Sequence, residues 1–361
     1  MDERAWVATR KGLFELQRSA HGWAIARVSF LGEPVSMVLP PLPSGRMLAA
    51  LNLGHFGVKV HASDDAGASW HEVATPAYPA QPEGAPGPAW KLMQIWSMQA
   101  TSGTAAGTVW AGTLPGGLFR SADQGDSWQL VEALWNRPER LEWFGGGYDA
   151  PGIHSICPHP EQPGELLVGV SCGGVWVGRD DAASWTLQAD GLRADYMPPE
   201  QAGSPNTQDP HLVVRCAARP EVLWCQHHNG IWRSTDNAAS WHEITGAPVA
   251  NFGFAVAVHP ADPDTAWFVP AAADQRRVPV DAAMVVNRTR DGGRSFETLR
   301  SGLPQADAYD LVYRHGLAVG TDGARLLMGS TTGHLWSSDD AGDHWSAVGQ
   351  HLPPIYAVRF G

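Results

Sequence analysis

The sequence predicts an all-β fold built from repeated four-stranded antiparallel units, and three observations indicate it. The 361 residues contain 40 glycines and 28 prolines, which interrupt the chain too often for long helices. They also include 17 tryptophans, an unusually large number for this length. An eight-residue motif that ends in an aromatic residue recurs along the chain. Recurrence of this kind is typical of repeat architectures.

The motif has the pattern Ser/Thr-x-Asp-x-Gly-x-Ser-Trp, with changes at one or two positions in some copies. Asp and Ser side chains hydrogen-bond nearby backbone N–H groups and Gly adopts a positive φ, so each copy predicts a tight turn. An eroded copy ends at Trp23, which brings the number of repeats to seven. The other six end 49 to 58 residues apart, at Trp70, Trp128, Trp185, Trp241, Phe296 and Trp345.

Each repeat reads as four short strands, and the motif is the hairpin between the third and the fourth. In one repeat the expected strands are 153–160, 165–171, 174–179 and 185–188. A four-stranded sheet of about 50 residues cannot bury both of its faces alone, so the repeats must pack on one another. Seven twisted sheets arranged radially make a seven-bladed β-propeller.

The two ends of the chain complete one sheet in this interpretation. The first repeat has strands at 5–9, 12–17 and 23–28 but no innermost strand, whereas 355–360 (IYAVRF) is a strand without a sheet. We therefore expect the C-terminal strand to join the N-terminal blade and close the ring. This predicts a single propeller domain, 1–361, with blades at about 1–30 plus 355–361, 34–75, 93–131, 153–188, 211–245, 253–300 and 309–349.

The octapeptide resembles the Asp-box, or bacterial neuraminidase repeat (BNR), and the resemblance extends over nearly the whole chain. Sialidases, xyloglucan hydrolases, sorting receptors and photosystem assembly factors share this repeat, so the resemblance implies a fold and leaves the activity open. It also implies that the motif turns lie on one face of the propeller and that ligands bind at the other. A true sialidase is not expected, because the first blade has ATRKG and no Arg-Ile-Pro segment.

Composition excludes several classes of function. The formal net charge of −12 has the wrong sign for a nucleic-acid partner. The chain has no run of 18 apolar residues and no apolar stretch near its first residue, so we expect a cytoplasmic protein with no membrane partner. Four cysteines are too few for a disulfide scaffold, and we expect Cys157, Cys172, Cys216 and Cys225 to be buried as small hydrophobic residues.

Long connections mark the face where we expect a ligand. Three of them enter an innermost strand, at about 74–93, 131–152 and 188–210, and a fourth, at about 270–285, joins a second strand to a third. Connections of this length in a compact domain are typically functional. Aromatic residues mixed with arginines in these loops favour contact with a sugar or another polar ring. The alternative is that the aromatic side chains only pack over the blade edges.

The candidate site residues lie at the starts of innermost strands and in turns between second and third strands. We expect four carboxylates to supply general acid/base chemistry: Asp149, Asp209, Asp310 and Glu33. The candidates for ligand binding, orientation or charge stabilisation are Lys59, His55, His154, His211, His227, His228, Arg276, Tyr309 and Trp143. The alternative is a solvated mouth whose Asp residues cap turns. We expect neither a metal nor a cofactor, because no short metal-ligand spacing accompanies the histidines. The alternative is a nitrogen/oxygen metal site near the axis, formed by His154, Asp209, His211 and His227 or His228.

These residues predict a propeller that binds a polar small molecule or a carbohydrate at its loop-rich mouth. If the site is catalytic, a glycoside-hydrolase-like enzyme is the expected class. The alternative is a binding or assembly propeller without chemistry, whose aromatic loops contact a protein partner. A polar pocket with two close carboxylates would favour the first reading, and a flat apolar surface would favour the second.

Overall fold

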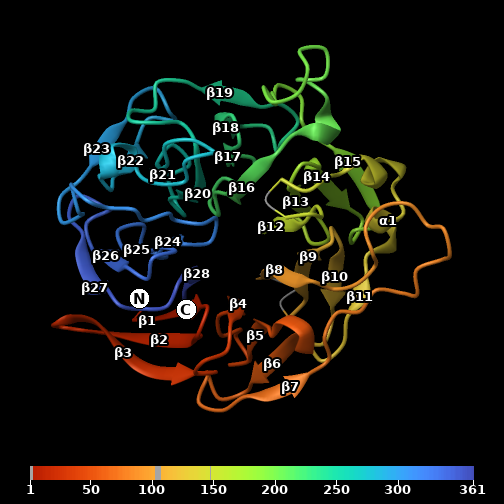
Figure 1. The fold of residues 1–361 in the computed structure, drawn as a ribbon, viewed down its shortest axis with the longest axis horizontal. Helices are drawn as coiled ribbons and strands as arrows, with labels where there is room; N and C mark the ends of the chain where they lie inside the picture. Colours follow the sequence, from red (N-terminus) through yellow and green to blue (C-terminus); the bar gives the residue numbers. More distant parts are fainter. Residues whose placement is uncertain (1–2, 102–106, 147) are drawn as a thin grey trace. The chain divides into compact units, whose positions relative to one another are not determined.

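The computed structural model describes residues 3–101, 107–146 and 148–361, and it shows a seven-bladed β-propeller of four-stranded antiparallel sheets (Figure 1). This confirms the predicted fold class. The chain divides into two compact units. Unit 1 consists of Met1–Val35, Val214–Asn237 and Trp241–Gly361, and unit 2 of Ser36–Val213 and Ala238–Ser240.

Unit 1 contains three complete sheets. The first has the order β28-β1-β2-β3, with β28 at Ile355–Phe360, β1 at Arg4–Thr9, β2 at Gly12–Ser19 and β3 at Gly22–Ser29. The second runs from β20 to β23, at Gly253–Val258, Ala266–Pro270, Val286–Thr289 and Glu297–Leu299. The third runs from β24 to β27, at Leu317–Val319, Leu326–Gly329, Leu335–Ser338 and Ser346–Gly349.

Unit 2 contains three sheets. Strands β4 to β7 are Val35–Leu39, Met47–Asn52, Val58–Ser63 and His71–Val73. Strands β8 to β11 are Gln94–Ala100, Val109–Leu114, Leu118–Ser121 and Gln129–Leu130, and β12 to β15 are Ile153–Pro158, Leu166–Val170, Gly174–Arg179 and Ser184–Leu187. The seventh sheet has β16 to β19 at Pro210–Arg215, Leu223–His227, Gly230–Ser234 and His242–Ile244. Its strand residues from 214 onward, β19 included, belong to unit 1.

The C-terminal strand is the innermost strand of the N-terminal sheet, as the sequence predicts. β28 pairs antiparallel with β1, from Ala5 opposite Phe360 to Thr9 opposite Ile355. Ile355 and Val358 are fully buried and belong to one apolar cluster with residues of four other strands, Ala5, Val7, Phe14, Leu16, Leu327 and Leu335. The last residues of the chain therefore supply core to the first ones.

The octapeptides form the turns between third and fourth strands, and their hydrogen bonds repeat from sheet to sheet. In the turn at 121–128, the Ser121 hydroxyl donates to Asp123 Oδ1 at 2.7 Å and accepts the Gly125 N–H at 2.7 Å. The Ser127 N–H and hydroxyl donate to the two oxygens of Asp123, at 2.9 and 2.6 Å. The turns at 63–70 and 289–296 repeat this pattern around Asp65 and Asp291.

These bonds make the turns sensitive to acid. Hydrogen bonds from Ser127 are the largest cause that lowers the pKa of Asp123, to about 2. Hydrogen bonds from Ser295 lower the pKa of Asp291 to about 2 in the same way, and those from Ser69 lower the pKa of Asp65. Because a carboxyl in the unfolded chain titrates near 3.8, the turns stabilise the fold above that pH. The contribution is lost as the pH falls from about 4 to about 2.

Asp123→Asn should therefore lower stability at pH 7 and weaken the acid dependence. Asn accepts fewer of the bonds that Ser121 and Ser127 donate, and we expect a loss of about 1 kcal/mol for this exposed group. Thermal melts between pH 2 and pH 7 measure both effects. Glu83→Gln, which changes an exposed carboxylate outside these turns, is the control. Equal melting curves for Asp123→Asn and wild type at all pH values would contradict the prediction.

Buried tryptophans and the arginines opposite them join neighbouring blades within each unit. In three sheets a Trp of the second strand lies opposite an Arg of the third: Trp110 with Arg120, Trp224 with Arg233 and Trp267 with Arg288. Each Arg then pairs with an Asp of the following sheet: Arg120 with Asp181 at 2.9 Å, Arg233 with Asp264, and Arg288 with Asp343 at 2.7 Å. Because the Trp–Arg pairing has the same register in all three sheets, Trp, Arg and Asp recur at corresponding positions of the repeats.

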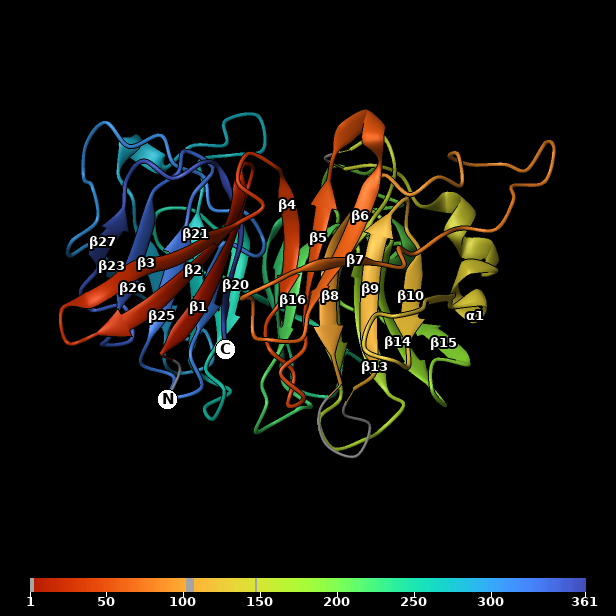
Figure 2. The ribbon, with the colours of Figure 1, turned by 90° about the horizontal axis from the view of Figure 1, so that it is seen from below.

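The long connections between strands are 74–93, 131–152, 188–209, 271–285 and 300–316. The connection 131–152 contains a short helix α1, Glu132–Trp135, and a 3-10 turn, Pro138–Glu142. In unit 2, Figure 2 shows α1 and the connection that follows β7 toward the same end of the sheets as the β5–β6 turn. We call this the loop end of unit 2.

Candidate functional site

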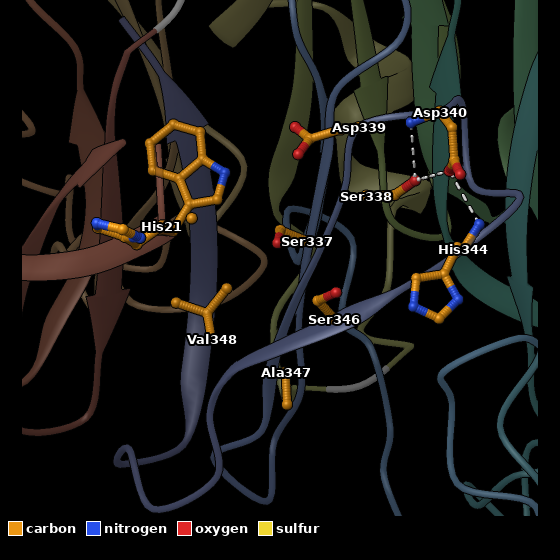
Figure 3. A pocket seen from close by; sticks show the side chains of 11 residues that line it. His21, Ser337, Ser338, Asp339, Asp340, His344, Ser346, Ala347 and Val348 are labelled. Atoms are coloured by element: carbon orange, nitrogen blue, oxygen red, sulfur yellow. Dashed lines mark hydrogen bonds between the residues drawn. The ribbon is translucent and has the colours of Figure 1, made fainter. Parts of the chain in front are cut away.

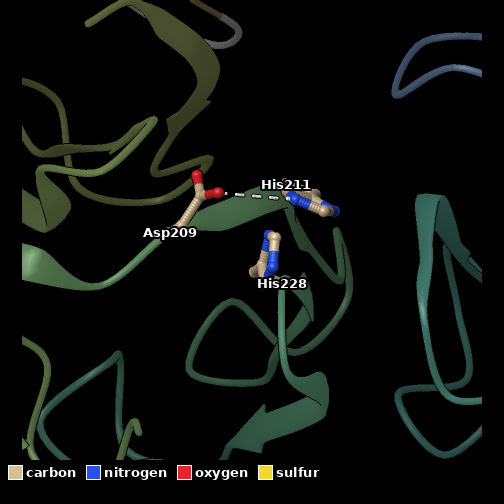
Figure 4. Close-up of side chains that lie close together, drawn as sticks. All are labelled: Asp209, His211 and His228. Carbon is tan, nitrogen blue, oxygen red and sulfur yellow. Dashed lines mark ion pairs between the residues drawn. The ribbon is translucent and has the colours of Figure 1, made fainter. Parts of the chain in front are cut away.

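A carboxylate and an imidazole form a buried pair at the loop end of unit 2. Asp209 directly precedes β16, and His211 is the second residue of that strand. Their exposed fractions are 4% and 2%. Asp209 Oδ1 accepts the Cys172 N–H at 3.2 Å, and Asp209 Oδ2 lies 3.5 Å from His211 Nε2 (Figure 4). The sequence predicted both residues for the site, and the structure brings them together.

The connection 131–152 passes directly over this pair. A Cβ atom on Gly146 would lie 3.1 Å from Asp209 Oδ2 and 2.9 Å from Cys172 Sγ. A side chain at position 146 would therefore displace the carboxylate or the thiol. Cys172 itself lies in the β13–β14 turn with a positive φ of 45° and is 2% exposed. The four cysteines form no disulfide and are buried, as predicted.

Hydrogen bonds join the two loops that surround Asp209. The Trp143 indole N–H donates to Asn206 Oδ1 at 2.8 Å. The Asn206 amide donates in turn to the Glu139 carbonyl oxygen at 2.8 Å and to Glu142 Oε2 at 3.0 Å. Asn206 is 4% exposed, so these bonds are shielded from water. The connections 131–152 and 188–209 therefore act as one cover.

Trp143, predicted to bind ligand, lies inside this cover. It is 5% exposed, and its ring contacts the Trp176 ring at a centroid distance of 5.8 Å. Gly173 leaves room for it, because a Cβ there would lie 2.9 Å from the Trp143 ring. In this position Trp143 holds the loop in place.

Tyr196 adds a protonated hydroxyl beside the pair. Its side chain is 38% exposed, and its hydroxyl donates to the Thr207 carbonyl oxygen. Burial of the hydroxyl raises its pKa, and the nearby Asp209 and Cys172 raise it further. The phenol therefore stays protonated at neutral pH and acts as a hydrogen-bond donor.

Aromatic side chains form a ledge at the entry to β12. The buried His154 has its Nδ1 2.9 Å from the Ser155 hydroxyl, and its ring meets the edge of Trp96 at 5.5 Å. Trp96 contacts Tyr148 at 5.3 Å, and Tyr148 is 45% exposed. Asp149 follows Tyr148 and is exposed. An exposed ring beside a solvated carboxylate is a surface to which a sugar or another polar ring can bind.

The other two candidates of unit 2 lie at the β5–β6 hairpin. Lys59 Nζ pairs with Glu72 Oε1 of β7 at 2.7 Å, and this contact lowers the pKa of Glu72. His55 is exposed in the turn Gly54–Phe56, with its ring 3.8 Å from that of Phe56.

In unit 1, Asp310 is held by three side chains. It is 4% exposed, and its Oδ1 accepts the Ser330 hydroxyl at 2.7 Å, accepts the Thr332 hydroxyl, and lies 2.7 Å from His334 Nδ1. Tyr309 beside it is 61% exposed. The innermost strand β24 begins only at Leu317, because residues 309–316 form an irregular segment in place of the expected strand start.

The remaining candidates of unit 1 lie at the β17–β18 turn, between β3 and β4, and in the connection 271–285. His227 is buried and its Nδ1 accepts the Asn229 N–H at 3.1 Å, while His228 is half-buried with its ring 5.7 Å from that of Phe252. Glu33 is exposed between β3 and β4. Arg276 is exposed in a tight turn, bridged to Ala273.

The sequence reasoning named Arg277 and Tyr196 only as residues of long connections, and it did not assign Arg314, Cys172, Asn206 or Gly146 to the site. In unit 1, the guanidinium carbons of Arg277 and Arg314 each lie 5.3 Å from the centre of the Phe254 ring. In unit 2, Cys172, Tyr196, Asn206 and Gly146 come from three separate connections, so only the folded arrangement shows that they surround Asp209. The one sequence feature that could have indicated them is their position, because all belong to long connections or to turns between second and third strands.

Comparisons with known proteins identify the fold. No family model and no curated protein matches the sequence. An ancestral GH74 enzyme has a similar structure over 91% of this chain, with 15% identity and a TM-score of 0.58, and the chain spans 38% of that enzyme's length. YCF48 bound to D1 peptide matches over 94% of this chain and 90% of its own, with 13% identity and a TM-score of 0.55.

A protein of Bacteroides uniformis, provisionally assigned as a 6-phosphogluconolactonase, matches over the full length of both chains with 12% identity and a TM-score of 0.61. Identities this low establish a shared β-propeller fold alone. In the part of the chain that the structure describes, no helix has the length and hydropathy to cross a bilayer.

Proposed function

We propose that the loop end of unit 2 binds a polar small molecule or a carbohydrate, as in Asp-box propellers with glycoside-hydrolase activity. The observation that supports this most is the Asp209–His211 pair beneath two hydrogen-bonded loops. Burial of a carboxylate beside an imidazole costs desolvation free energy. Buried titratable groups of this kind cluster at functional sites.

The chemistry that we propose for the pair is proton transfer or orientation. Asp209 Oδ2 faces His211 Nε2, so the carboxylate can orient an imidazole that exchanges a proton with a ligand hydroxyl. Because the Tyr196 hydroxyl donates its one proton to Thr207, its oxygen is the proposed acceptor from a ligand hydroxyl. Asp149 is the proposed second carboxylate at the exposed rim. The Trp96–Tyr148 ledge is the proposed contact for a ring face.

In unit 1, Asp310 is bonded through Oδ1 alone among its described contacts, and we propose its second oxygen as a ligand acceptor.

Asp209→Asn tests this proposal. The substitution keeps the shape of the side chain and removes the charge that faces His211, so we expect at least a tenfold loss of affinity, or of turnover if the protein is an enzyme. A panel of oligosaccharides, sugar phosphates and lactones, measured by calorimetry and by hydrolysis assay, provides the readout. Asp149→Asn should have a smaller effect, because Asp149 is exposed.

Asp195→Asn, at an exposed residue of the same loop that pairs with Arg193 at 2.6 Å, is the matched control. We expect it to bind like wild type. If folded Asp209→Asn and Asp149→Asn both retain full binding and turnover, the site assignment is wrong.

A second candidate function is protein binding without chemistry, and one observation favours it. The described residues include eleven exposed large hydrophobic side chains, and only Ile25 and Val28 lie within a strand. The other nine lie on connections into innermost strands or between second and third strands; those of unit 2 are Phe56, Met93, Leu141, Phe144, Tyr148 and Tyr196. Exposed hydrophobic surface of this kind is typical of interaction sites.

Leu141→Ser combined with Phe144→Ser separates the two candidates. A protein-binding propeller should lose a co-purifying stoichiometric partner in this variant and should show loop 131–152 protected from proteolysis only in the complex. A small-molecule site should keep its ligand affinity within about twofold, because both side chains point to solvent.

A further inference from the structure

A polar pocket of about 250 Å³ lies in unit 1, away from the candidate residues described above (Figure 3). One wall is the β2–β3 turn, with His21 and Trp23, and the other is the end of β26, the turn after it and β27, with Ser337, Asp340, His344 and Ser346. The volume is sufficient for one six-membered sugar ring.

The pocket lies where a short turn faces a full-length one. The turn between β2 and β3 has only two residues between the paired Ser19 and Gly22, whereas the turn between β26 and β27 is the complete octapeptide at 338–345. This short turn corresponds to the eroded motif at Trp23. His21 and Trp23 therefore face the neighbouring turn across the pocket.

A substitution in the full-length turn leaves one carboxylate oxygen without its usual donor. In the turns around Asp65, Asp123 and Asp291, a Ser hydroxyl donates to Oδ2 of the Asp at 2.6 Å. The corresponding residue near Asp340 is His344, whose N–H donates to Asp340 Oδ1 at 2.9 Å and whose Nδ1 lies 2.9 Å from the Ser301 hydroxyl. Within the described residues, no side chain replaces the missing hydroxyl at Asp340 Oδ2.

The carboxylates of the lining disfavour an anionic ligand. Asp339 is paired with Arg18 at 2.8 Å, and His21 lies across the pocket from Asp340 and His344 (Figure 3). An anion would approach the carboxylates of both Asp339 and Asp340. A polyhydroxylated neutral molecule can donate to Asp340 and also exchange hydrogen bonds with Ser337 and Ser346.

From this geometry we propose that the pocket binds a single neutral sugar ring, with Asp340 Oδ2 accepting from a sugar hydroxyl and Trp23 packing against the ring face. The site is separate from the loop end of unit 2 and adds a second ligand position to the protein. A ligand of about twelve heavy atoms implies a Kd of about 1–10 mM.

His344→Ser tests this site. The new hydroxyl should bond to Asp340 Oδ2 as in the other turns, which offsets the lost contact of His344 with Ser301, and we expect sugar affinity to fall about tenfold. The readout is saturation-transfer NMR titration with D-glucose, D-galactose, D-mannose and D-xylose. Trp23→Ala should abolish the saturation transfer, because it removes the wall against the ring.

Ser295→Ala is the matched control, since it removes the same hydroxyl-to-Asp bond in a turn that does not line the pocket. It should bind sugars like wild type, and so should Asp209→Asn. Equal affinity of wild type and His344→Ser, failure of all four sugars to bind, or binding of inorganic phosphate or ethylamine in place of sugars would overturn the proposal.

Discussion

Removal of residues 355–361 is expected to prevent stable folding of unit 1. The deletion takes away β28, whose residues Ile355, Ala357 and Val358 are fully buried. It also exposes the ladder edge of β1 and opens the apolar cluster around Val7 and Leu327. Whole domains have a free energy of unfolding of only about 5–15 kcal/mol. We expect the loss of this innermost strand to cost unit 1 more than that free energy.

Circular dichroism melts and soluble yield measure this effect. We expect the truncated protein to be insoluble or to melt without a cooperative transition. Deletion of Gly361 alone is the control, because this exposed residue contributes one bond, from its N–H to the Arg4 carbonyl oxygen. A truncated protein that melts cooperatively within a few degrees of wild type would show that β28 does not complete the first sheet.

Trp143→Ala is the second substitution with a large expected effect. The indole is buried against Trp176 and Gly173, and it donates the bond to Asn206 that joins the two loops over Asp209. Removal of a buried Trp typically costs about 3–5 kcal/mol. We expect the melting temperature to fall by several degrees and the connection 131–152 to become sensitive to protease.

Phe144→Ala is the matched control for this effect, because the neighbouring ring is 38% exposed. It should change stability by less than about 1 kcal/mol and leave the loop protected. If Trp143→Ala melts and resists protease like Phe144→Ala, the indole does not hold the cover in place.

The sequence contained enough local information to predict the fold. The bonds of each octapeptide link residues within four positions of one another, as between Ser121, Asp123, Gly125 and Ser127, so the turns can be identified without the rest of the chain. The closing strand could also be predicted, since 355–360 had no other sheet to join. The irregular segment 309–316 was not predictable, because its apolar residues read equally well as a strand.

The candidate site was predictable only in part. Asp209 and His211 are two residues apart at the start of β16, so their proximity follows from the position of that strand. The cover over them depends on contacts between residues far apart in sequence, such as Trp143 with Asn206 and Gly146 with Asp209. Sequence alone therefore did not indicate that Trp143 would point inward while Tyr148 stayed exposed.

Hydrogen–deuterium exchange with a bound ligand tests the central claim most directly. The ligand is the panel member, or the co-purifying partner, that binds most tightly to wild type. If the loop end of unit 2 is the main site, amides in 139–149 and 194–211 should exchange more slowly in the complex, and Asp209→Asn should remove that protection. Slower exchange confined to other segments, or no change in these two loops at saturating ligand, would contradict it.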